Sequence, residues 1–294
     1  MVIRKTLVQV AAPHFVMKKI IIESYGVQIK IETDLSIDFD DINVRLAKNL
    51  PNGFKILKKD TFLHHFFITK KEMMFQLRKF ELSKEEILSE SGVLDILLEQ
   101  MVSRVRITVA EFAIGKVFLH AGVVAVEGKA IVLPGRSFQG KTTLVAELVK
   151  IGAVYYSDEY AVLDERGYVY PFPKMLSMRG IIDDYTQLDM PVEEFGGVAG
   201  TEPIPVALIL ITEYKRNAVW KPRELSSGRG IMEILPHTLP IRNKPEFTLN
   251  VLNNVAERAI ITKTKRAEAN KTARLLISLF EEKLLKFNSI HQLR

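Results

Sequence analysis

The chain has 294 residues, of which 47% are hydrophobic and 26% are charged. This composition is typical of globular proteins, so collagen-like, low-complexity and wholly disordered chains are excluded, and the length predicts about two domains. Cysteine is absent, which excludes disulfides, thiolate nucleophiles, cysteine-bound zinc and iron–sulfur clusters. The net charge of +6 is a mild excess that suits a solvated surface or an anionic ligand.

No segment has the pattern of a targeting signal or a membrane span. The basic pair Lys18-Lys19 precedes a short apolar run, residues 20–22, that is too small for the core of a signal peptide. A later apolar run, residues 204–211, contains a proline and falls well below the roughly 18 residues that a spanning helix needs. We therefore expect a cytoplasmic protein that binds neither a membrane nor nucleic acid.

Residues 1–115 are predicted to form an α+β region. Alternating β-branched residues over 20–32 indicate a hairpin. The sequence Ser-Lys-Glu-Glu at 83–86 has the pattern of a capping box and predicts the start of a helix. Apolar residues then recur at helical spacing over 93–112.

The pair His64-His65 is the feature of this region that first suggests a metal site. Neither a carboxylate nor a third histidine stands at ligand spacing, so we interpret the pair as strand residues. The role of residues 1–115 stays open between binding an acceptor and packing against the rest of the chain.

The next segment alternates strands with one helix. Strand-like runs occupy 117–126 and 129–134, joined by a Glu-Gly turn. After a glycine-rich loop, apolar residues at helical spacing lead to Gly152, and a short apolar strand covers 153–157.

The glycine-rich loop matches the phosphate-binding pattern G-x-x-x-x-G-K-[ST] in full. Its residues are Gly135, Arg136, Ser137, Phe138, Gln139, Gly140, Lys141 and Thr142, followed by Thr143. The glycines allow successive backbone N–H groups to face a phosphate chain. Lys141 is expected to reach the β- and γ-phosphates, and the Thr142 hydroxyl can bind Mg²⁺. The position between a predicted strand and a predicted helix supports this interpretation.

Two carboxylates, Asp158 and Glu159, follow the strand after the loop. A helical crossover makes the strands at 129–134 and 153–157 run parallel. Their carboxyl ends then share one edge of the sheet, where ligands bind in such folds. We therefore expect the pair beside the loop, with one carboxylate holding Mg²⁺ and the other orienting or deprotonating a nucleophile.

His120 is placed by strand register. A two-residue turn at Glu127-Gly128 pairs the residues on either side of it, and the same antiparallel register pairs His120 with Gly135. The histidine is therefore expected near the bound phosphates.

The C-terminal part is predicted to be mostly helical. A helix is expected over 246–258, a strand over 259–262, and an amphipathic helix over 266–287. The basic stretches 215–216 and 223–229 are interpreted as solvated loops. The last helix suits either internal packing or a homo-oligomer.

These motifs resemble the HPr kinase/phosphorylase family and its HPr-kinase-like relatives. In that family a Leu-His-Gly segment precedes the phosphate loop, and an apolar strand leads to Ala-Asp-Asp. Here residues 119–122 read Leu-His-Ala-Gly and residues 157–159 read Ser-Asp-Glu, at the family's spacing without gaps. Residues 178–183 resemble its Arg-Gly signature with a Leu-Gly pair missing. The resemblance covers about residues 117–183 well and the C-terminal helices loosely.

The resemblance implies an α/β (mixed α+β) fold, in which residues 116–294 form a P-loop kinase domain of the phosphoenolpyruvate-carboxykinase type that uses ATP and Mg²⁺. It implies that Asp158 is the base that activates a seryl hydroxyl, with help from His120. Glu159 stands where the family has a second aspartate, which makes it a metal ligand together with Thr142. Arg179 is then a phosphate contact.

The sequence therefore predicts an ATP-dependent phosphotransferase, with a protein serine as the favoured acceptor. A small-molecule kinase and an ATP-binding regulatory module without transfer activity are the alternatives. Asp158 argues against the regulatory module, while the bulky Phe138 in the loop favours it. The identity of the acceptor, HPr included, the presence of a phosphorylase activity and the oligomeric state stay open.

Overall fold

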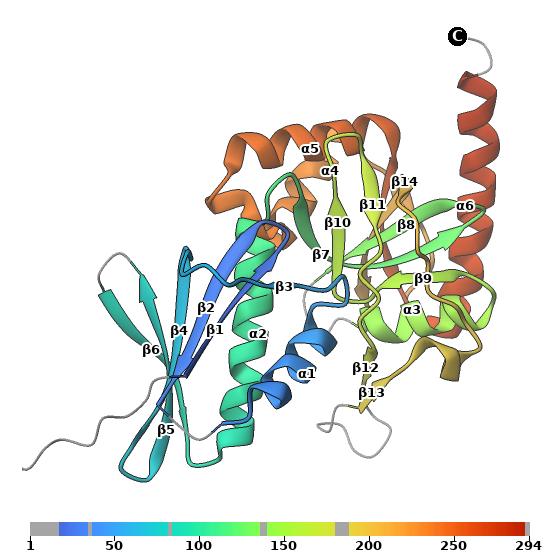
Figure 1. Ribbon diagram of the computed structural model, residues 1–294. Coiled ribbons are helices and arrows are strands. Elements are labelled where there is room, and N and C mark those ends of the chain that lie inside the picture. The colour runs from blue at the N-terminus through green and yellow to red at the C-terminus, as the bar shows by residue number, and fades with distance from the viewer. Residues whose placement is uncertain (1–17, 35–36, 82–83, 136–139, 180–187, 292–294) are drawn as a thin grey trace, which may run out of the picture.

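The computed structural model describes residues 18–34, 37–81, 84–135, 140–179 and 188–291. The chain has a mixed α/β fold built on a six-stranded sheet, an eight-stranded sheet and a two-stranded sheet (Figure 1). Within the described ranges, no helix combines the length and the apolar character that crossing a membrane requires.

Residues 18–91 contain the six-stranded sheet, whose strand order is β3-β1-β2-β4-β5-β6. Its strands are β1 (Lys18–Ser24), β2 (Val27–Thr33), β3 (Lys55–Ile56), β4 (His64–Lys71), β5 (Met74–Glu81) and β6 (Lys84–Ser91). The hairpin predicted at 20–32 is confirmed as β1 and β2. Tyr25 and Gly26 turn the chain with φ angles of 49° and 75°, which suit a two-residue turn.

Two helices cover one face of this sheet, α1 (Phe39–Asn49) and α2 (Leu94–Phe112). Ile42 of α1 and Met101 of α2 belong to the same buried apolar cluster as Ile31 of β2. The helix predicted over 93–112 is confirmed. Both helices lie between the six-stranded sheet and the rest of the chain (Figure 1).

The helix predicted to begin at residues 83–86 is wrong. Residues Lys84–Ser91 form β6 instead, which pairs antiparallel with β5. The helix begins at Leu94, where the Ser91 hydroxyl accepts a hydrogen bond from the Val93 N–H. The capping pattern is a local preference, and pairing along β5 outweighs it. The charged side chains of β6 suit the edge of a sheet.

Residues from 117 onward contain the eight-stranded sheet, with the order β11-β10-β7-β8-β14-β16-β15 and β9 paired to β7. The strands are β7 (Val117–Val126), β8 (Lys129–Pro134), β9 (Val154–Ser157), β10 (Tyr160–Leu163), β11 (Tyr168–Tyr170), β14 (Ile204–Tyr214), β15 (Arg223–Glu224) and β16 (Ile260–Arg266). Because β11 pairs with both β10 and β14, the sheet curls back on itself. Two further strands, β12 (Leu176–Met178) and β13 (Leu188–Met190), pair with each other.

Helices cover both faces of this sheet. They are α3 (Lys141–Lys150), α4 (Ser227–Ile234), α5 (Pro245–Arg258) and α6 (Ala269–His291), with short 3-10 turns η1 (Val192–Phe195), η2 (Leu235–His237) and η3 (Leu239–Arg242). Ile131 and Leu133 of β8 pack in the cluster with α3 and α6, whereas Val132 packs with α4 and α5. Side chains that alternate along β8 therefore supply two separate cores.

The predicted C-terminal helices are confirmed as α5 and α6, each within a few residues of its expected bounds. The stretch 223–229 is largely exposed, as predicted, but the prediction that it is a loop throughout is wrong. Residues 223–224 form the edge strand β15, which pairs with β16, and α4 begins at Ser227. The apolar residues that α4 buries against the sheet, Ile231 and Ile234, lie beyond the basic stretch, and they hold that stretch in regular structure.

The predicted register of β7 and β8 is confirmed. Val126 lies opposite Lys129, the turn residues have φ angles of 50° and 69°, and the Gly135 N–H donates to the His120 carbonyl at 3.3 Å. Strands β8 and β9 run in the same direction, as expected, because both are antiparallel to β7. They are not direct neighbours, since β7 lies between them.

The two sheets meet through an aromatic cluster and through hydrogen bonds from side chains to backbone carbonyls. Tyr25 packs edge-on against Phe118 of β7, with 5.1 Å between the ring centroids. The Lys244 ammonium donates to the carbonyls of Phe112 and Ala113, at 2.7 and 2.8 Å. The boundary expected between residues 115 and 116 falls in the segment joining α2 to β7, and the division into two domains stays a proposal.

Candidate functional site

A cavity of about 290 Å³ lies where β9 and the phosphate loop end, beside the first turn of α3. Its lining is His120, Gly140, Lys141, Thr142, Thr143, Asp158, Glu159, Ser177, Met178 and Arg179. The fold therefore brings most of the predicted site residues together. The predicted positions 136–139 lie outside the described residues, and Gly135 stands at the end of β8. The chemical roles assigned to these residues stay predictions.

Gly140 connects the phosphate loop to α3 in a conformation that favours glycine. Its φ angle is 70°, and the helix begins at the next residue. The Arg266 guanidinium donates a hydrogen bond to the Gly140 carbonyl at 2.9 Å. A Cβ at position 140 would lie 2.7 Å from that guanidinium. The first turn of α3 therefore lines the cavity, and the positive end of the helix dipole favours an anion there.

Lys141 places an ammonium group inside the cavity. Burial lowers the pKa of Lys141 to about 8, even though the charges of Asp158 and Glu159 act in the opposite direction. The side chain is thus largely protonated at neutral pH and is poorly hydrated. A poorly hydrated cation gains strongly from binding a phosphate group.

Asp158 is the most deeply buried carboxylate of the cavity, with 8% of its surface exposed. The Tyr155 hydroxyl donates to Oδ1 at 3.3 Å, the Ser177 N–H donates to Oδ2 at 3.4 Å, and the Thr142 side chain is also hydrogen-bonded to the carboxyl. Burial, followed by the charge of Glu159, raises the pKa of Asp158 to about 6. A carboxylate with a pKa near the working pH is suited to general-base catalysis.

His120 and Glu159 also line the cavity. His120 pairs across the sheet with Tyr160. Burial, followed by the charge of Lys141, lowers the pKa of His120 to about 4, so its ring is neutral at pH 7. Glu159 Oε1 lies 3.4 Å from Nη2 of Arg106, a residue of α2. The helix α2, which packs on the six-stranded sheet, thus contacts a predicted metal ligand.

Sequence reasoning missed four residues that shape the site: Arg106, Lys174, Ser177 and Arg266. Lys174 lies near Ser177, with 3.2 Å from Nζ to Oγ, and its charge acts to lower the pKa of Asp158. These residues come from α2, the segment before β12, β12 itself and the end of β16. No motif marks them, because tertiary contacts alone bring them to the phosphate loop.

The oxygen donors that line the cavity suit a magnesium ion by their chemistry. They are the Thr142 hydroxyl and the carboxylates of Asp158 and Glu159. Mg²⁺ prefers oxygen ligands and is commonly held by one or two carboxylates together with water and substrate phosphates. Among the described residues no group of three or more His, Cys, Asp or Glu side chains is placed to hold a metal. The donor set therefore suits an ion that binds together with phosphates.

No protein-family model matches the chain, and no curated protein matches it. A search of solved structures finds similarity to the structure of the Hpr(Ser) kinase/phosphatase from Coxiella burnetii, with 16% sequence identity. The similarity covers 58% of this chain and 98% of that chain, with a TM-score of 0.32. This is a weak structural similarity, and it assigns no residue of this chain to a role.

Proposed function

We propose that the chain is an ATP-dependent phosphotransferase of the P-loop kinase type, which acts in the cytoplasm and transfers the γ-phosphate of ATP to a hydroxyl group. The observation that carries the proposal is the position of Asp158. A buried carboxyl group with a raised pKa shares one cavity with Lys141 and the N-terminus of α3. A module that binds ATP only as a signal has no need of such a base.

In the proposed reaction, Asp158 accepts the proton of the acceptor hydroxyl while the acceptor oxygen forms a bond to the γ-phosphorus. The bond from that phosphorus to the bridging oxygen breaks, and ADP leaves. Backbone N–H groups at the start of α3 and the Lys141 ammonium hold the phosphates in line. Thr142 and Glu159 hold Mg²⁺, which neutralises charge on the phosphates when it is bound.

His120 is neutral at physiological pH, so it acts through a hydrogen bond and not through a charge. Its place in the same cavity supports a role in orienting the acceptor hydroxyl toward Asp158. Arg179 lines the cavity at the end of β12 and is proposed to contact phosphate oxygens.

Two classes of acceptor are consistent with this chemistry. The resemblance to HPr kinases favours a protein serine. A small-molecule alcohol is the second candidate, and it is favoured by a larger cavity of about 580 Å³ that shares Ser177 with the site cavity.

The test combines ATP binding by calorimetry with transfer from γ-labelled ATP. Lys141→Ala is expected to weaken ATP binding by at least about tenfold, because a charge-assisted hydrogen bond to phosphate is lost. Lys150→Ala is the matched control, since Lys150 lies on the same helix with its side chain half exposed and paired to Glu147 at 2.7 Å. Equal ATP binding by the wild type and Lys141→Ala would contradict the proposal. Tight binding with neither hydrolysis nor transfer would identify a regulatory module instead.

A further inference from the structure

A second cavity adjoins the site cavity and is large enough for a substrate. Its volume is about 580 Å³, within the range of roughly 300–1,000 Å³ that small-molecule pockets occupy. It lies between the C-terminal end of α1, the middle of α2 and the segment 173–177. Ser177 lines both cavities, and its backbone N–H is bonded to Asp158. The second cavity therefore borders a residue that contacts the proposed base.

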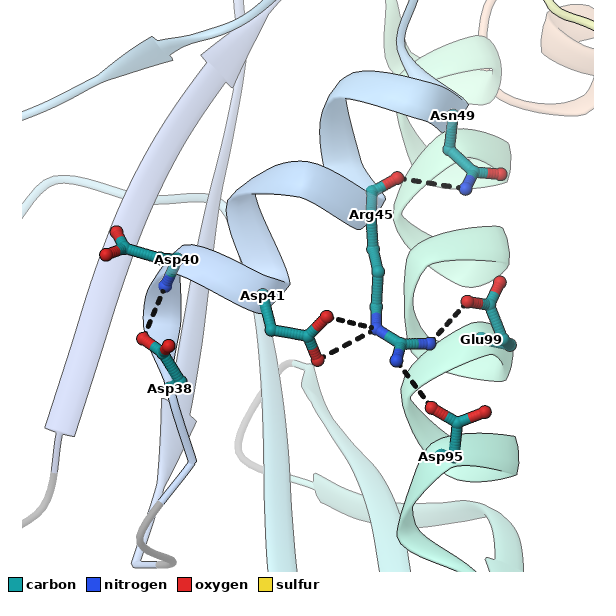
Figure 2. Close-up of polar contacts among 7 residues, drawn as sticks. All are labelled: Asp38, Asp40, Asp41, Arg45, Asn49, Asp95 and Glu99. Carbon is teal, nitrogen blue, oxygen red and sulfur yellow. Dashed lines mark hydrogen bonds and ion pairs between the residues drawn. The ribbon is translucent and has the colours of Figure 1, made fainter.

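The carboxylates of this cavity are already paired. Figure 2 shows Arg45 of α1 pointing at Asp41, Asp95 and Glu99, and its guanidinium is hydrogen-bonded to all three. Glu99 is thus neutralised by a cation of the protein, and the charge of Arg45 is fully engaged.

Asp189 is the other carboxylate that lines the cavity. It accepts a hydrogen bond from the Ser177 hydroxyl at 2.6 Å and lies 4.0 Å from the Lys174 ammonium. Among the described residues, each carboxylate that lines the cavity therefore has a hydrogen-bond donor.

Two cations of the lining are incompletely paired. Lys48 is exposed at the end of α1 and takes part in none of the ion pairs among the described residues. The Arg106 side chain donates to the Asn49 side chain, is hydrogen-bonded to Tyr160 and lies 3.4 Å from Glu159, but its Nε is buried without a hydrogen-bond partner. Buried donors are seldom left unpaired in folded proteins. A ligand that draws the guanidinium into the cavity would supply the missing acceptor.

We propose that this cavity is the acceptor subsite and that it takes a small alcohol bearing a carboxylate or phosphate group. The inference rests on the proposed function and narrows its acceptor. The anionic group binds Lys48 and Arg106, and the hydroxyl passes Ser177 to reach Asp158. A neutral serine on a protein loop brings no anion to these two cations, so it matches the lining less well.

The first test measures binding of glycerol 3-phosphate by calorimetry to the full chain saturated with a non-hydrolysable ATP analogue. Saturation fills the phosphate loop, so the heat reports a second anion site. Lys48→Gln and Arg106→Gln are expected to weaken this binding by about tenfold or more, since each removes a charge-assisted hydrogen bond. Arg104→Gln is the matched control, because Arg104 is exposed and lies two residues away on α2, on the opposite face. Unchanged binding in both subsite variants would overturn the inference.

The second test measures transfer from γ-labelled ATP to glycerol 3-phosphate, D-glycerate, glycerol and a neutral serine peptide. Labelling of an anionic alcohol, with a KM that rises about tenfold or more in Lys48→Gln while the KM for ATP is unchanged, supports the subsite. Equal use of glycerol and glycerol 3-phosphate, or labelling of the peptide alone, overturns the inference and leaves the proposed function standing. Binding of glycerol 3-phosphate without transfer to any of these acceptors would identify an anion site only, and it would overturn both its role as an acceptor subsite and the proposed function.

Discussion

The molecule holds two clusters of charged residues that differ in how their charges are arranged. Around Arg45, three carboxylates from α1 and α2 surround one cation, and their side chains are 43–68% exposed. Around Asp158, two adjacent carboxylates and Lys141 lie together in a cavity, and Asp158 is 8% exposed. In the first cluster each carboxylate has a hydrogen-bonded cation and water nearby. In the second, burial and like charge oppose ionisation.

This contrast separates a structural cluster from the one that we propose to be catalytic. An ion pair at the surface contributes little to stability and alters the charge of its members little. When burial beside another carboxylate raises the pKa of a carboxyl group, its ionised form is destabilised. Groups of this kind are concentrated at active sites. The arrangement around Asp158 therefore supports the proposed catalytic role, whereas the one around Arg45 joins two helices.

The largest effect is expected when Asp158 is compared with Asp164, a second buried aspartate. Asp164 accepts hydrogen bonds from the backbone of Arg166 and Tyr168 and from the Tyr170 hydroxyl, so it stabilises the turn between β10 and β11. Asp158→Asn is expected to lower the transfer rate by about 10²- to 10⁴-fold and to leave ATP binding intact. Asp164→Asn is expected to leave the transfer rate of the folded protein unchanged. Full transfer activity in Asp158→Asn would remove the proposed base.

The same two variants are expected to change stability in opposite directions. The pKa of Asp158, about 6, is above its ordinary value, so the native state binds the proton more tightly than the unfolded state does. The free energy of unfolding therefore falls as the pH rises from about 4 to 6. Asp158→Asn should therefore stabilise the protein at pH 7 by about 1–3 kcal/mol. Burial raises the pKa of Asp164, but its hydrogen bonds to Tyr168 and Arg166 outweigh burial and hold the pKa below its usual value. Asp164→Asn should therefore destabilise the folded protein at pH 7. Urea denaturation measures the change in the free energy of unfolding for each variant. Changes of the same sign in the two variants would contradict this prediction.

The pH dependence of kcat/KM is expected to have two limbs. Below pH about 6, Asp158 becomes protonated and activity falls about tenfold per pH unit, because only the ionised carboxylate accepts a proton. Above pH about 8, Lys141 loses its charge and activity falls again. His120 is neutral throughout this range, so His120→Gln should leave both limbs in place. A profile that is flat between pH 5 and pH 7 would contradict the raised pKa of Asp158.

A smaller effect is expected from glycines that share a left-handed conformation. Gly140 and Gly128 have φ angles of 70° and 69°, but only the Cβ added at position 140 would meet another group, the Arg266 guanidinium. Gly128→Ala should cost about 1–2 kcal/mol of backbone strain and leave ATP binding unchanged. Gly140→Ala should cost more and should also weaken ATP binding, as thermal unfolding and calorimetry would measure. Equal effects of the two variants would mean that Arg266 does not hold the loop.

The smallest effect is expected from Arg45→Met. The apolar part of the side chain is retained, so the change removes the three ion pairs and little packing. Because the partners are largely exposed, the loss should be about 0.5–1.5 kcal/mol and should shrink in high salt. ATP binding should be unchanged. A loss of several kcal/mol would mean that the ion pairs of Arg45 behave like buried ones, and the contrast with the cluster around Asp158 would fail.

The sequence predicted those features that local spacing controls. The hairpin at 20–32, the long helix ending near 112 and the pairing of His120 with Gly135 all follow from patterns within short stretches. Local pattern also explains the errors. A capping box at 83–86 and a basic stretch at 223–229 were outweighed by strand pairing that the sequence does not display.

By itself the sequence identified the glycine-rich loop that we propose binds phosphate, the strand that follows its helix and the carboxylates at the end of that strand. A turn, a helix and a crossover of fixed hand leave few ways to arrange them. The tertiary structure alone decided that Arg106 contacts Glu159, that Lys174 and Ser177 flank Asp158, and that α1 and α2 enclose a cavity beside the base. These residues are far apart in the chain, and only the packing of the two sheets brings their side chains together.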